Sequence, residues 1–384
     1  MIEKTEPDWD PRSAAALHDQ RAVYDQMREQ CPVAYSDFLQ WSLFRHEDVL
    51  RVLNDHQTFS NAVSRHLSVP NGMDPPEHTP YRRIIEPYFS PQRMEAFEPI
   101  CRELAVDLVC SALACGELDL MAEFALPLAA YAQCAFLGWP PSMRTPLIRW
   151  TQNNYQATLA RDRQTLADLA RQFEGYIDEL LETRLQAEAG PESDLTAALM
   201  HEKVAGRPLS NEEIASLLRN WTVGEIGTLS ASIGILVHFL AVQEPWQDRL
   251  RADPALIPRA VEEILRIDGP LATNRRVATC PVEIGGRQIA AGEQVTLHWI
   301  AANRDQRVFD APEAFQLDRD QSNNLLWGAG IHVCPGAPLA RLELRVCLEE
   351  LLQRSAQIQL NPDKSPVRGV YPACGFASLP VRIQ

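Results

Sequence analysis

Hydrophobic residues recur every three or four positions through the middle of this chain, a spacing that predicts amphipathic helices. The helices predicted in this part span 121–137, 143–160, 165–189 and 210–242. The last is apolar on nearly every face between Trp221 and Leu240. A helix of that kind is usually buried at the centre of a large protein. Similar spacing predicts further helices over 17–30, 46–54, 77–89, 90–113, 257–267 and 337–354.

The pattern changes to strands in a smaller part of the chain. Residues 277–297 alternate apolar and polar positions around glycines, which predicts short antiparallel strands. Strand-like runs also occur within 32–44 and near the C-terminus, and irregular sequence fills 303–330. No internal repeat or low-complexity linker separates these parts. We therefore expect one large, mainly α domain over 1–384 with a small β lobe. Its helix-rich parts are about 75–268 and 335–354, and its β-rich parts are about 30–45, 270–300 and 356–384.

Composition narrows the class of protein. The 36 basic and 51 acidic side chains give a net charge of −15, which repels phosphate backbones and argues against nucleic-acid binding. We find no run of the roughly 18 to 20 apolar residues that a membrane span needs. Residues 1–10 lack the pattern of a signal peptide. The nine scattered cysteines include no Cys-x-x-Cys pair, which favours reduced thiols and a cytoplasmic location.

One segment stands out chemically: residues 327–341, WGAGIHVCPGAPLAR. It places Cys334 between a glycine-rich loop and the predicted start of a helix. Backbone N–H groups at a helix start stabilise a thiolate. Gly328, Gly330 and Gly336 allow the backbone to turn tightly and to approach a flat ligand closely. Taken alone, a buried structural cysteine is the simpler interpretation.

The segment closely resembles the haem loop of the cytochrome P-450 superfamily, F-x-x-G-x-H/R-x-C-x-G followed by L-A-R. Every fixed position matches except the first, where Trp327 replaces Phe. Glu263 and Arg266 resemble the family's E-x-x-R motif, whose charges can pair on one helix face. Residues 302–319 resemble the irregular meander, which supplies an Arg to that pair. Residues 73–83 resemble the bacterial D-P-P-E-H-T-x-x-R-R segment.

The resemblance implies the P-450 fold and haem b, with the Cys334 thiolate as axial ligand of the iron. The haem would lie between the long central helix and the cysteine loop. Its propionates need cations or hydrogen-bond donors when buried. The resemblance assigns propionate contacts to four side chains and close backbone approach to two glycines: His78, Arg82, Arg276, His332, Gly328 and Gly336.

The long apolar helix carries the candidate distal residues. Gly224 to Thr228 reads GEIGT, whereas the family pattern is A/G-G-x-D/E-T, with an acid and a Thr that deliver protons during oxygen activation. We align Thr228 with the family Thr, which leaves Gly227 at the position of the acid. Glu225 lies on the same helix face as Thr228 and could deliver the proton instead. In the alternative interpretation, Glu225 pairs with an Arg and only stabilises the fold.

These residues together imply a bacterial-type haem-thiolate monooxygenase that inserts one oxygen atom from O2 into a small hydrophobic or aromatic substrate. Ferredoxin and ferredoxin reductase would supply its electrons. By family position, the substrate pocket would be lined by mainly neutral segments at 60–71, 145–180, 226–230, 271–274 and 374–376. Two alternatives remain open. One is a peroxygenase that uses hydrogen peroxide directly, and the other is a non-catalytic haem-thiolate sensor or carrier.

Overall fold

The computed structural model describes residues 6–64 and 66–384. The chain divides into two compact units. Unit 1 contains residues 6–64, 258–334 and 367–377, and unit 2 contains residues 66–257, 335–366 and 378–384. Residue 65, in the predicted pocket segment 60–71, and residues 1–5, at the start of the chain, lie outside the described residues. The expected single domain over 1–384 stays a prediction.

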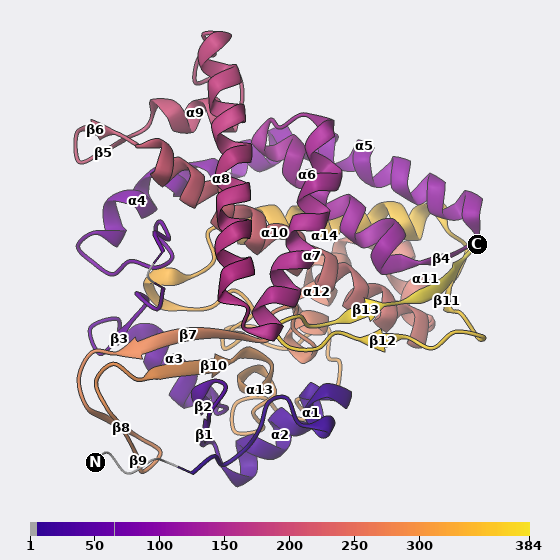
Figure 1. Cartoon of the computed structure of the whole chain (residues 1–384). Helices are drawn as coiled ribbons and strands as arrows, with labels where there is room; N and C mark the ends of the chain where they lie inside the picture. The colour runs from indigo at the N-terminus through magenta and orange to yellow at the C-terminus, as the bar shows by residue number, and fades with distance from the viewer. Residues whose placement is uncertain (1–5, 65) are drawn as a thin grey trace. The chain divides into compact units, whose positions relative to one another are not determined.

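A five-stranded sheet organises unit 1 (Figure 1). Its strands lie in the order β1 (Val33–Ser36), β2 (Gln40–Leu43), β10 (Gln294–His298), β7 (Thr273–Ala278) and β3 (Phe59–Ser60). Strand β10 pairs parallel with β2 and antiparallel with β7. Two small ribbons pair β8 (Val282–Ile284) with β9 (Arg287–Ile289), and β12 (Val367–Arg368) with β13 (Phe376–Ser378).

The helices of unit 1 are short, and α3 and α13 share a hydrophobic core with this sheet. The helices of this unit are α1 (Ala14–His18), α2 (Gln20–Gln30), α3 (His46–Asn54), α12 (Ile257–Ile267), α13 (Trp299–Asn303) and the 3-10 turn η5 (Gly330–His332). One hydrophobic core joins the sheet to α3 and includes Trp41, Phe59, Val295 and Trp299. A second core contains Trp9, Tyr24 and Phe44. The first core uses apolar strand positions that face the same side of the sheet, whereas the second is built mainly from helix and loop residues.

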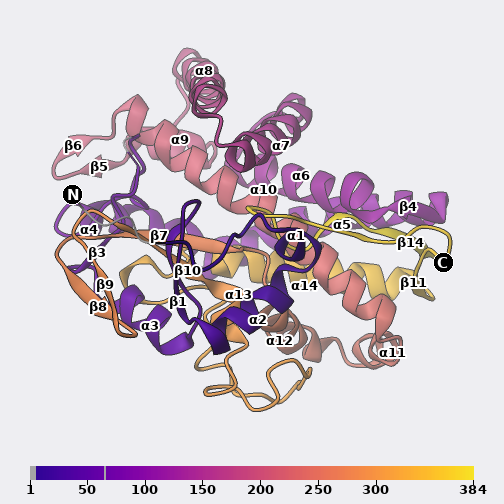
Figure 2. The same cartoon turned by 60° about the horizontal axis from the view of Figure 1, so that its bottom comes forward.

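Unit 2 is built mainly from helices (Figures 1 and 2). They are α4 (His78–Ile85), η1 (Glu86–Phe89), α5 (Pro91–Cys115), η2 (Met121–Ala125), α6 (Leu126–Leu137), η3 (Pro141–Met143), α7 (Arg144–Ala160), α8 (Arg163–Gln186), α9 (Leu195–His201), α10 (Asn211–Val242), α11 (Pro245–Ala252), η4 (Pro254–Leu256) and α14 (Ala337–Arg354). Helix α14 lies along α5, and α10 packs against α6, α7, α8 and α14. Three small strands, β11 (Ile358–Leu360), β14 (Pro380–Ile383) and β4 (Glu117–Asp119), form one sheet, and β5 (Lys203–Val204) pairs with β6 (Arg207–Pro208).

Helix α10 is the central core helix that the sequence predicts. Its first turn is closed by a capping box, in which Ser210 Oγ accepts from Glu213 N and Glu213 Oε2 accepts from Ser210 N. Among the described residues, α10 alone is long and apolar enough to cross a membrane. However, 78% of its most apolar stretch is buried inside the protein. The apolar surface of α10 is therefore used for packing.

The sequence predicts several elements with the correct bounds, notably α3, α12 and α14. The predicted helix over 17–30 divides into α1 and α2 at Asp19, whose carboxylate accepts hydrogen bonds from Arg21 N and Ala22 N at the start of α2. Helices α9 and α11 are not predicted. Pro245 occupies the first position of α11, where its missing N–H is tolerated.

Candidate functional site

The cysteine loop of unit 1 is a tightly closed turn that ends at the start of α14. Cys334 is exposed, and its backbone N–H donates a hydrogen bond to Trp327 O at 2.8 Å. Gly328 and Gly330 adopt left-handed conformations, with φ of 74° and 69°. A Cβ on Gly330 would lie 2.3 Å from the backbone oxygen of Leu53. The loop therefore requires glycine there, as the sequence motif indicated.

Trp327 replaces the usual phenylalanine of the loop motif and gains a polar contact. Its indole Nε1 lies 3.0 Å from both carboxylate oxygens of Glu262 on α12. Nearby, Leu325 N donates to Asn303 Oδ1 at 2.8 Å, which ties the loop to the end of α13. The start of the cysteine loop is thus held by side chains from two other elements of unit 1.

The E-x-x-R pair forms the buried centre of unit 1. Glu263 and Arg266 are both 0% exposed, and Arg266 Nε lies 2.8 Å from Glu263 Oε2. Arg319 Nε lies 2.8 Å from Glu263 Oε1, which confirms the expected third member from the meander. Burial alone would raise the pKa of Glu263, but the hydrogen bonds from the two arginines lower it below its ordinary value. Arg266 also donates to the backbone oxygens of Asn303 and Pro312, so the ion pairs shape the irregular segment.

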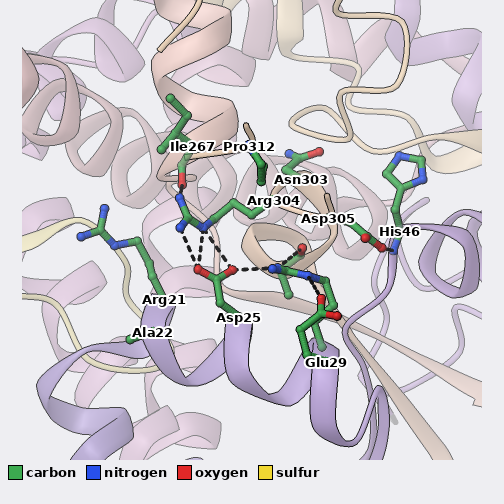
Figure 3. A network of polar contacts seen from close by, with 12 residues as sticks. Arg21, Ala22, Asp25, Glu29, His46, Ile267, Asn303, Arg304, Asp305 and Pro312 are labelled. Carbon is green, nitrogen blue, oxygen red and sulfur yellow. Dashed lines mark hydrogen bonds and ion pairs between the residues drawn. The ribbon is translucent and has the colours of Figure 1, made fainter. Parts of the chain in front are cut away.

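A second ionic network attaches the N-terminal helices to this segment (Figure 3). Asp25 on α2 accepts hydrogen bonds from Arg304 and Arg28, with the shortest contact to each at 2.7 Å. Arg28 also donates to the backbone oxygen of Ala301 at 2.9 Å. Asp305 accepts from the backbone N–H of His46 at the start of α3. Helices α2 and α3 therefore support the chain that leads to the cysteine loop.

Each unit carries two of the four predicted propionate partners. In unit 2, His78 and Arg82 lie one turn apart on α4, and Arg82 Nε lies 2.8 Å from Glu86 Oε1. In unit 1, Arg276 lies on β7 and is buried, while His332 ends the turn η5 before the cysteine. The structure thus places the first two on one helix face and the other two on separate elements of unit 1.

Exposed apolar side chains occur in both units. Eight large apolar side chains are exposed among the described residues, and three of them lie in or next to predicted site segments: the distal segment, the pocket segment 271–274 and the cysteine loop. These three are Val223, Leu271 and Val333, which are 37%, 37% and 40% exposed. On α10, a Cβ on Gly224 would meet open space. In unit 1, the exposed Cys334 thiol follows the glycine turn directly and adjoins the exposed Val333, so the residues present there fit a haem held by a thiolate.

On α10, Thr228 and Gly227 each make a defined contact. Thr228 Oγ1 donates a hydrogen bond to Gly224 O, four residues earlier, at 2.6 Å. A Cβ on Gly227 would lie 1.5 Å from the hydroxyl oxygen of Tyr155 on α7. The phenol of Tyr155 therefore takes the space that an acidic side chain at position 227 would need. The sequence analysis did not single out Tyr155.

Glu225 has a partner, but the partner is not an arginine. It is buried on α10 next to Glu343 of α14, and no ion pair to Glu225 is found among the described residues. The interpretation in which Glu225 pairs with an Arg is therefore wrong. Burial raises the pKa of Glu225. Burial, and then the charge of Glu225, raise the pKa of Glu343 well above its ordinary value.

The cytochrome P450 family model matches residues 139–380 of the chain. This protein belongs to the cytochrome P450 family. It is 32% identical over 369 residues to the erythromycin C-12 hydroxylase of Saccharopolyspora erythraea, with 92% of each chain covered. It is 34% identical over 342 residues to the mycinamicin IV hydroxylase/epoxidase of Micromonospora griseorubida, with 85% of each chain covered.

Solved P450 structures have the same fold. A mutant of P450 EryK in complex with erythromycin B is similar at a TM-score of 0.86 and 30% identity, with 96% of this chain and 97% of that one covered. CYP109E1 from Bacillus megaterium in complex with corticosterone is similar at 0.84 and 26% identity, with 96% and 99% covered. The predicted fold class, the bacterial-type family and the monooxygenase class are therefore confirmed.

Membership in the P450 family implies a haem whose iron is held by a cysteine thiolate. In this P450, the loop closed by Gly328 and Gly330 presents Cys334 at the motif position. The sequence analysis missed Glu343, although a signal was present. On its helix, Leu342, Leu344 and Cys347 are buried on different sides, so an acid among them is buried as well and needs a polar partner.

Proposed function

We propose that this P450 inserts one atom of O2 into a small hydrophobic organic substrate, using haem b ligated by Cys334. The observation that carries the proposal is the closed glycine turn, which leaves the Cys334 thiol exposed directly before α14. When bound, the thiolate-ligated haem supplies the oxygen-activating chemistry, since thiolate donation favours O–O cleavage. Electrons would come from a ferredoxin and its reductase.

The other proposed haem contacts are four side chains for the propionates and two glycines beside the porphyrin. His78, Arg82, Arg276 and His332 would receive the propionates, because buried anions need cationic or N–H partners. Arg82 would then divide its donors between a propionate and Glu86, with which it pairs at 2.8 Å. Gly328 and Gly336 would let the backbone approach the porphyrin without side-chain interference.

Thr228 and Glu225 would manage protons on the distal side. The single hydroxyl proton of Thr228 is donated to Gly224 O, so its oxygen presents only lone pairs and acts as a hydrogen-bond acceptor. The proton itself must come from another group. Glu225, one turn earlier on the same helix, is the acid nearest in sequence to that position.

The substrate class rests on the neutral character of the expected pocket segments. On α10, Gly227 and Thr228 are uncharged, and the phenol of Tyr155 packs over Gly227. The solved neighbours hold organic compounds, erythromycin B in one and corticosterone in the other. These observations support a hydrophobic organic substrate over an ionic one.

The central test is the carbon monoxide spectrum of the reduced protein. We expect the strongly red-shifted Soret band of a thiolate-ligated haem, and we expect Cys334→Ser to abolish or move it. Cys280→Ser, which changes another exposed cysteine of unit 1, serves as the control and should leave the band unchanged. An unaltered band in Cys334→Ser would disprove the assignment of the ligand.

The electron source is tested separately by measuring product. Turnover with NADH, ferredoxin and reductase is compared with turnover in peroxide alone and with neither. We expect product in the first case, and Glu225→Gln should slow it while haem and substrate binding remain. Product formed in peroxide alone, with none from the ferredoxin system, would show that the protein is a peroxygenase.

A further inference from the structure

One hydrogen bond joins helix α4 to the start of helix α10 within unit 2. The hydroxyl of Tyr81 on α4 donates it to Oε1 of Glu213, although the two residues are 132 positions apart in the sequence. Both side chains are buried. Helix α4 is only 8 residues long, and a helix of that length depends on tertiary contacts for its stability and its position.

The carboxylate of Glu213 is held from several sides. Besides the Tyr81 hydroxyl, Oε1 accepts a hydrogen bond from Arg207 Nη2 at 2.6 Å. The other oxygen, Oε2, accepts from Arg207 Nη1 and from Ser210 N, both at 2.8 Å. Arg207 lies on β6, whose partner strand β5 contacts α4 (Figures 1 and 2). A bidentate arginine fixes the geometry of the carboxylate that Tyr81 meets.

The two side chains keep the protonation states that this hydrogen bond needs. Hydrogen bonds from Arg207 lower the pKa of Glu213 to about 2, so the carboxylate is ionised at neutral pH. Burial raises the pKa of Tyr81, and the hydrogen bond to Glu213 raises it further, so the phenol retains its proton. A neutral donor therefore faces a charged acceptor, which makes the bond stronger than one between two neutral groups.

Tyr81 lies on the face of α4 that carries two predicted propionate partners. His78, Tyr81 and Ile85 are the buried residues of the helix, and Arg82 follows Tyr81 directly. Positions 78, 81, 82 and 85 share one face, because a helix repeats every three to four residues. Side chains of one short helix move together. The contact that holds Tyr81 therefore also determines where His78 and Arg82 lie.

Glu213 lies at the other end of this contact, on a firm support. It is the third residue of α10 and completes the capping box with Ser210. Most of the apolar stretch of α10 is buried, so the helix has little freedom to shift. The same helix carries Thr228, a candidate distal residue. One carboxylate thus connects the helix with the distal candidates to the helix with two predicted propionate partners.

We propose that Glu213 is a positioning residue for the haem, which acts through the hydroxyl of Tyr81 to place His78 and Arg82 against a propionate. The proposal rests on the haem assignment of the proposed function. When the contact is lost, α4 can shift, and the cations of His78 and Arg82 neutralise the propionate less completely. Uncompensated negative charge near the iron favours the ferric state and lowers the reduction potential. Weaker contacts also let the haem dissociate faster.

A second tyrosine–glutamate contact in unit 2 provides the matched control. Tyr88 in η1 donates a hydrogen bond to Oε1 of Glu202, at the end of α9, at 2.8 Å. The turn η1 contains none of the predicted propionate partners. Tyr88→Phe therefore removes the same type of hydrogen bond as Tyr81→Phe, but from an element that does not carry His78 or Arg82.

Transfer of haem from the loaded protein to excess apomyoglobin measures how firmly the cofactor is held. We expect Tyr81→Phe to lose haem roughly tenfold faster than the wild type, since a hydrogen bond to a charged group contributes at least about that factor. Tyr88→Phe should stay near the wild-type rate. Equal rates of haem loss in the two variants would overturn the proposal.

The haem reduction potential separates positioning from general stability. We expect a lower potential in haem-loaded Tyr81→Phe than in the wild type, and the wild-type potential in Tyr88→Phe. A role limited to the stability of the fold would leave the potential of a folded, haem-loaded variant unchanged. An unmoved potential in Tyr81→Phe would therefore overturn the positioning role.

A double-mutant cycle shows whether Glu213 acts through Tyr81. Glu213→Gln keeps an oxygen that can accept from the Tyr81 hydroxyl but loses the charge, so its effect on haem loss and potential should be smaller than that of Tyr81→Phe. The double variant should match Tyr81→Phe alone, because the hydroxyl that transmits the effect is already gone. Effects that add would overturn the proposal. If Glu213→Gln fails to fold, the comparison of Tyr81→Phe with Tyr88→Phe still decides.

The carbon monoxide band distinguishes this failure from failure of the proposed function. Absence of the thiolate band in the wild type overturns the haem assignment and the role of Glu213 with it. A normal band, together with unchanged haem transfer and potential in Tyr81→Phe, overturns the positioning role alone.

Discussion

Glu263 in unit 1 and Glu343 in unit 2 are both buried, but their surroundings shift the pKa of the two carboxyl groups in opposite directions. Glu263 is 0% exposed and bound by two arginines, whereas Glu343 is 2% exposed and touches another acid. The pKa of Glu263 is lowered by its cations, and that of Glu343 is raised by burial. Burial alone therefore does not set the state of an acid; the nearest charged group decides it.

The difference also separates two uses of a buried acid. The arginines bound to Glu263 have donors left over, which reach backbone oxygens of Asn303, Pro312 and Asp310. An ionised acid with such partners fixes the path of an irregular segment. Glu343 has no such cation, so it fixes little backbone. With its raised pKa, Glu343 instead retains a carboxyl proton at a pH where Glu263 is ionised.

The largest expected effect comes from breaking the triad of unit 1. Arg266→Met leaves a buried Glu263 with one cation and removes donors from two backbone oxygens. Loss of one partner of a buried ion pair costs about 3–5 kcal/mol. We expect that loss in denaturant unfolding, together with poor haem incorporation, because the segment leading to Cys334 loses its support. Arg259→Met, which breaks an exposed pair with Asp318, should cost at most about 1 kcal/mol. Equal losses in the two variants would contradict this account.

A second effect concerns His298 of unit 1, a buried base without a charge partner. Both ring nitrogens lack a hydrogen-bond partner among the described residues, and the ring stacks on Phe44 at 4.3 Å. Burial lowers its pKa from 6.5 to about 3. Between pH 6.5 and pH 3, His298 is therefore protonated in the unfolded chain but neutral in the folded chain. The free energy of unfolding falls as the pH drops through this range. The expected loss is on the order of 5 kcal/mol.

The His298→Phe variant tests this acid sensitivity. Its unfolding free energy, measured by denaturant titration from pH 7.5 to pH 3.5, should fall less than that of the wild type. His18→Phe, which changes an exposed histidine, should keep the wild-type pH dependence. If His298→Phe lost stability with acid as steeply as the wild type, burial of the neutral imidazole would not be the cause.

Opposite pH slopes should appear when the two acids are compared directly. A raised pKa at Glu343 means that its stabilising contribution is present below the ordinary value of 4.5 and is lost as the pH rises. Glu343→Gln should therefore gain stability relative to wild type above pH 4.5, by up to about 1.4 kcal/mol per pH unit. Glu263 has a lowered pKa, so Glu263→Gln should be most destabilised near pH 7 and less so as the pH falls through 4.5. Thermal unfolding from pH 4 to pH 8 checks both signs, and parallel slopes would refute the comparison.

The smallest effect is expected at Trp327. Trp327→Phe restores the usual family residue but removes the hydrogen bond from Nε1 to Glu262. The loss of one such bond costs roughly 1 kcal/mol. Thermal unfolding should show this decrease with the carbon monoxide band unchanged. Glu262→Gln, which retains an acceptor oxygen, should lose less, and a larger loss in Glu262→Gln would point to another role for the acid.

Much of the fold could be predicted from local patterns. Apolar spacing gave the bounds of α3, α12 and α14, because a helix repeats within a few residues and ends at local caps. The pairing of Glu263 with Arg266 was predictable for the same reason, since positions i and i+3 share a helix face. The family motif around Cys334 likewise depends on a continuous run of residues, and the glycine conformations in that run agree with it.

The sequence by itself therefore determined the helices, the cysteine loop and the acid–base pair on one helix, because each depends on neighbours along the chain. Only the tertiary structure decided that Glu225 meets Glu343 and not an arginine, and that the phenol of Tyr155 occupies the space at Gly227. These partners come from different helices, and no periodicity along the chain encodes which side chains will meet. The charge state of a buried acid follows from that meeting, so it is decided when the helices pack.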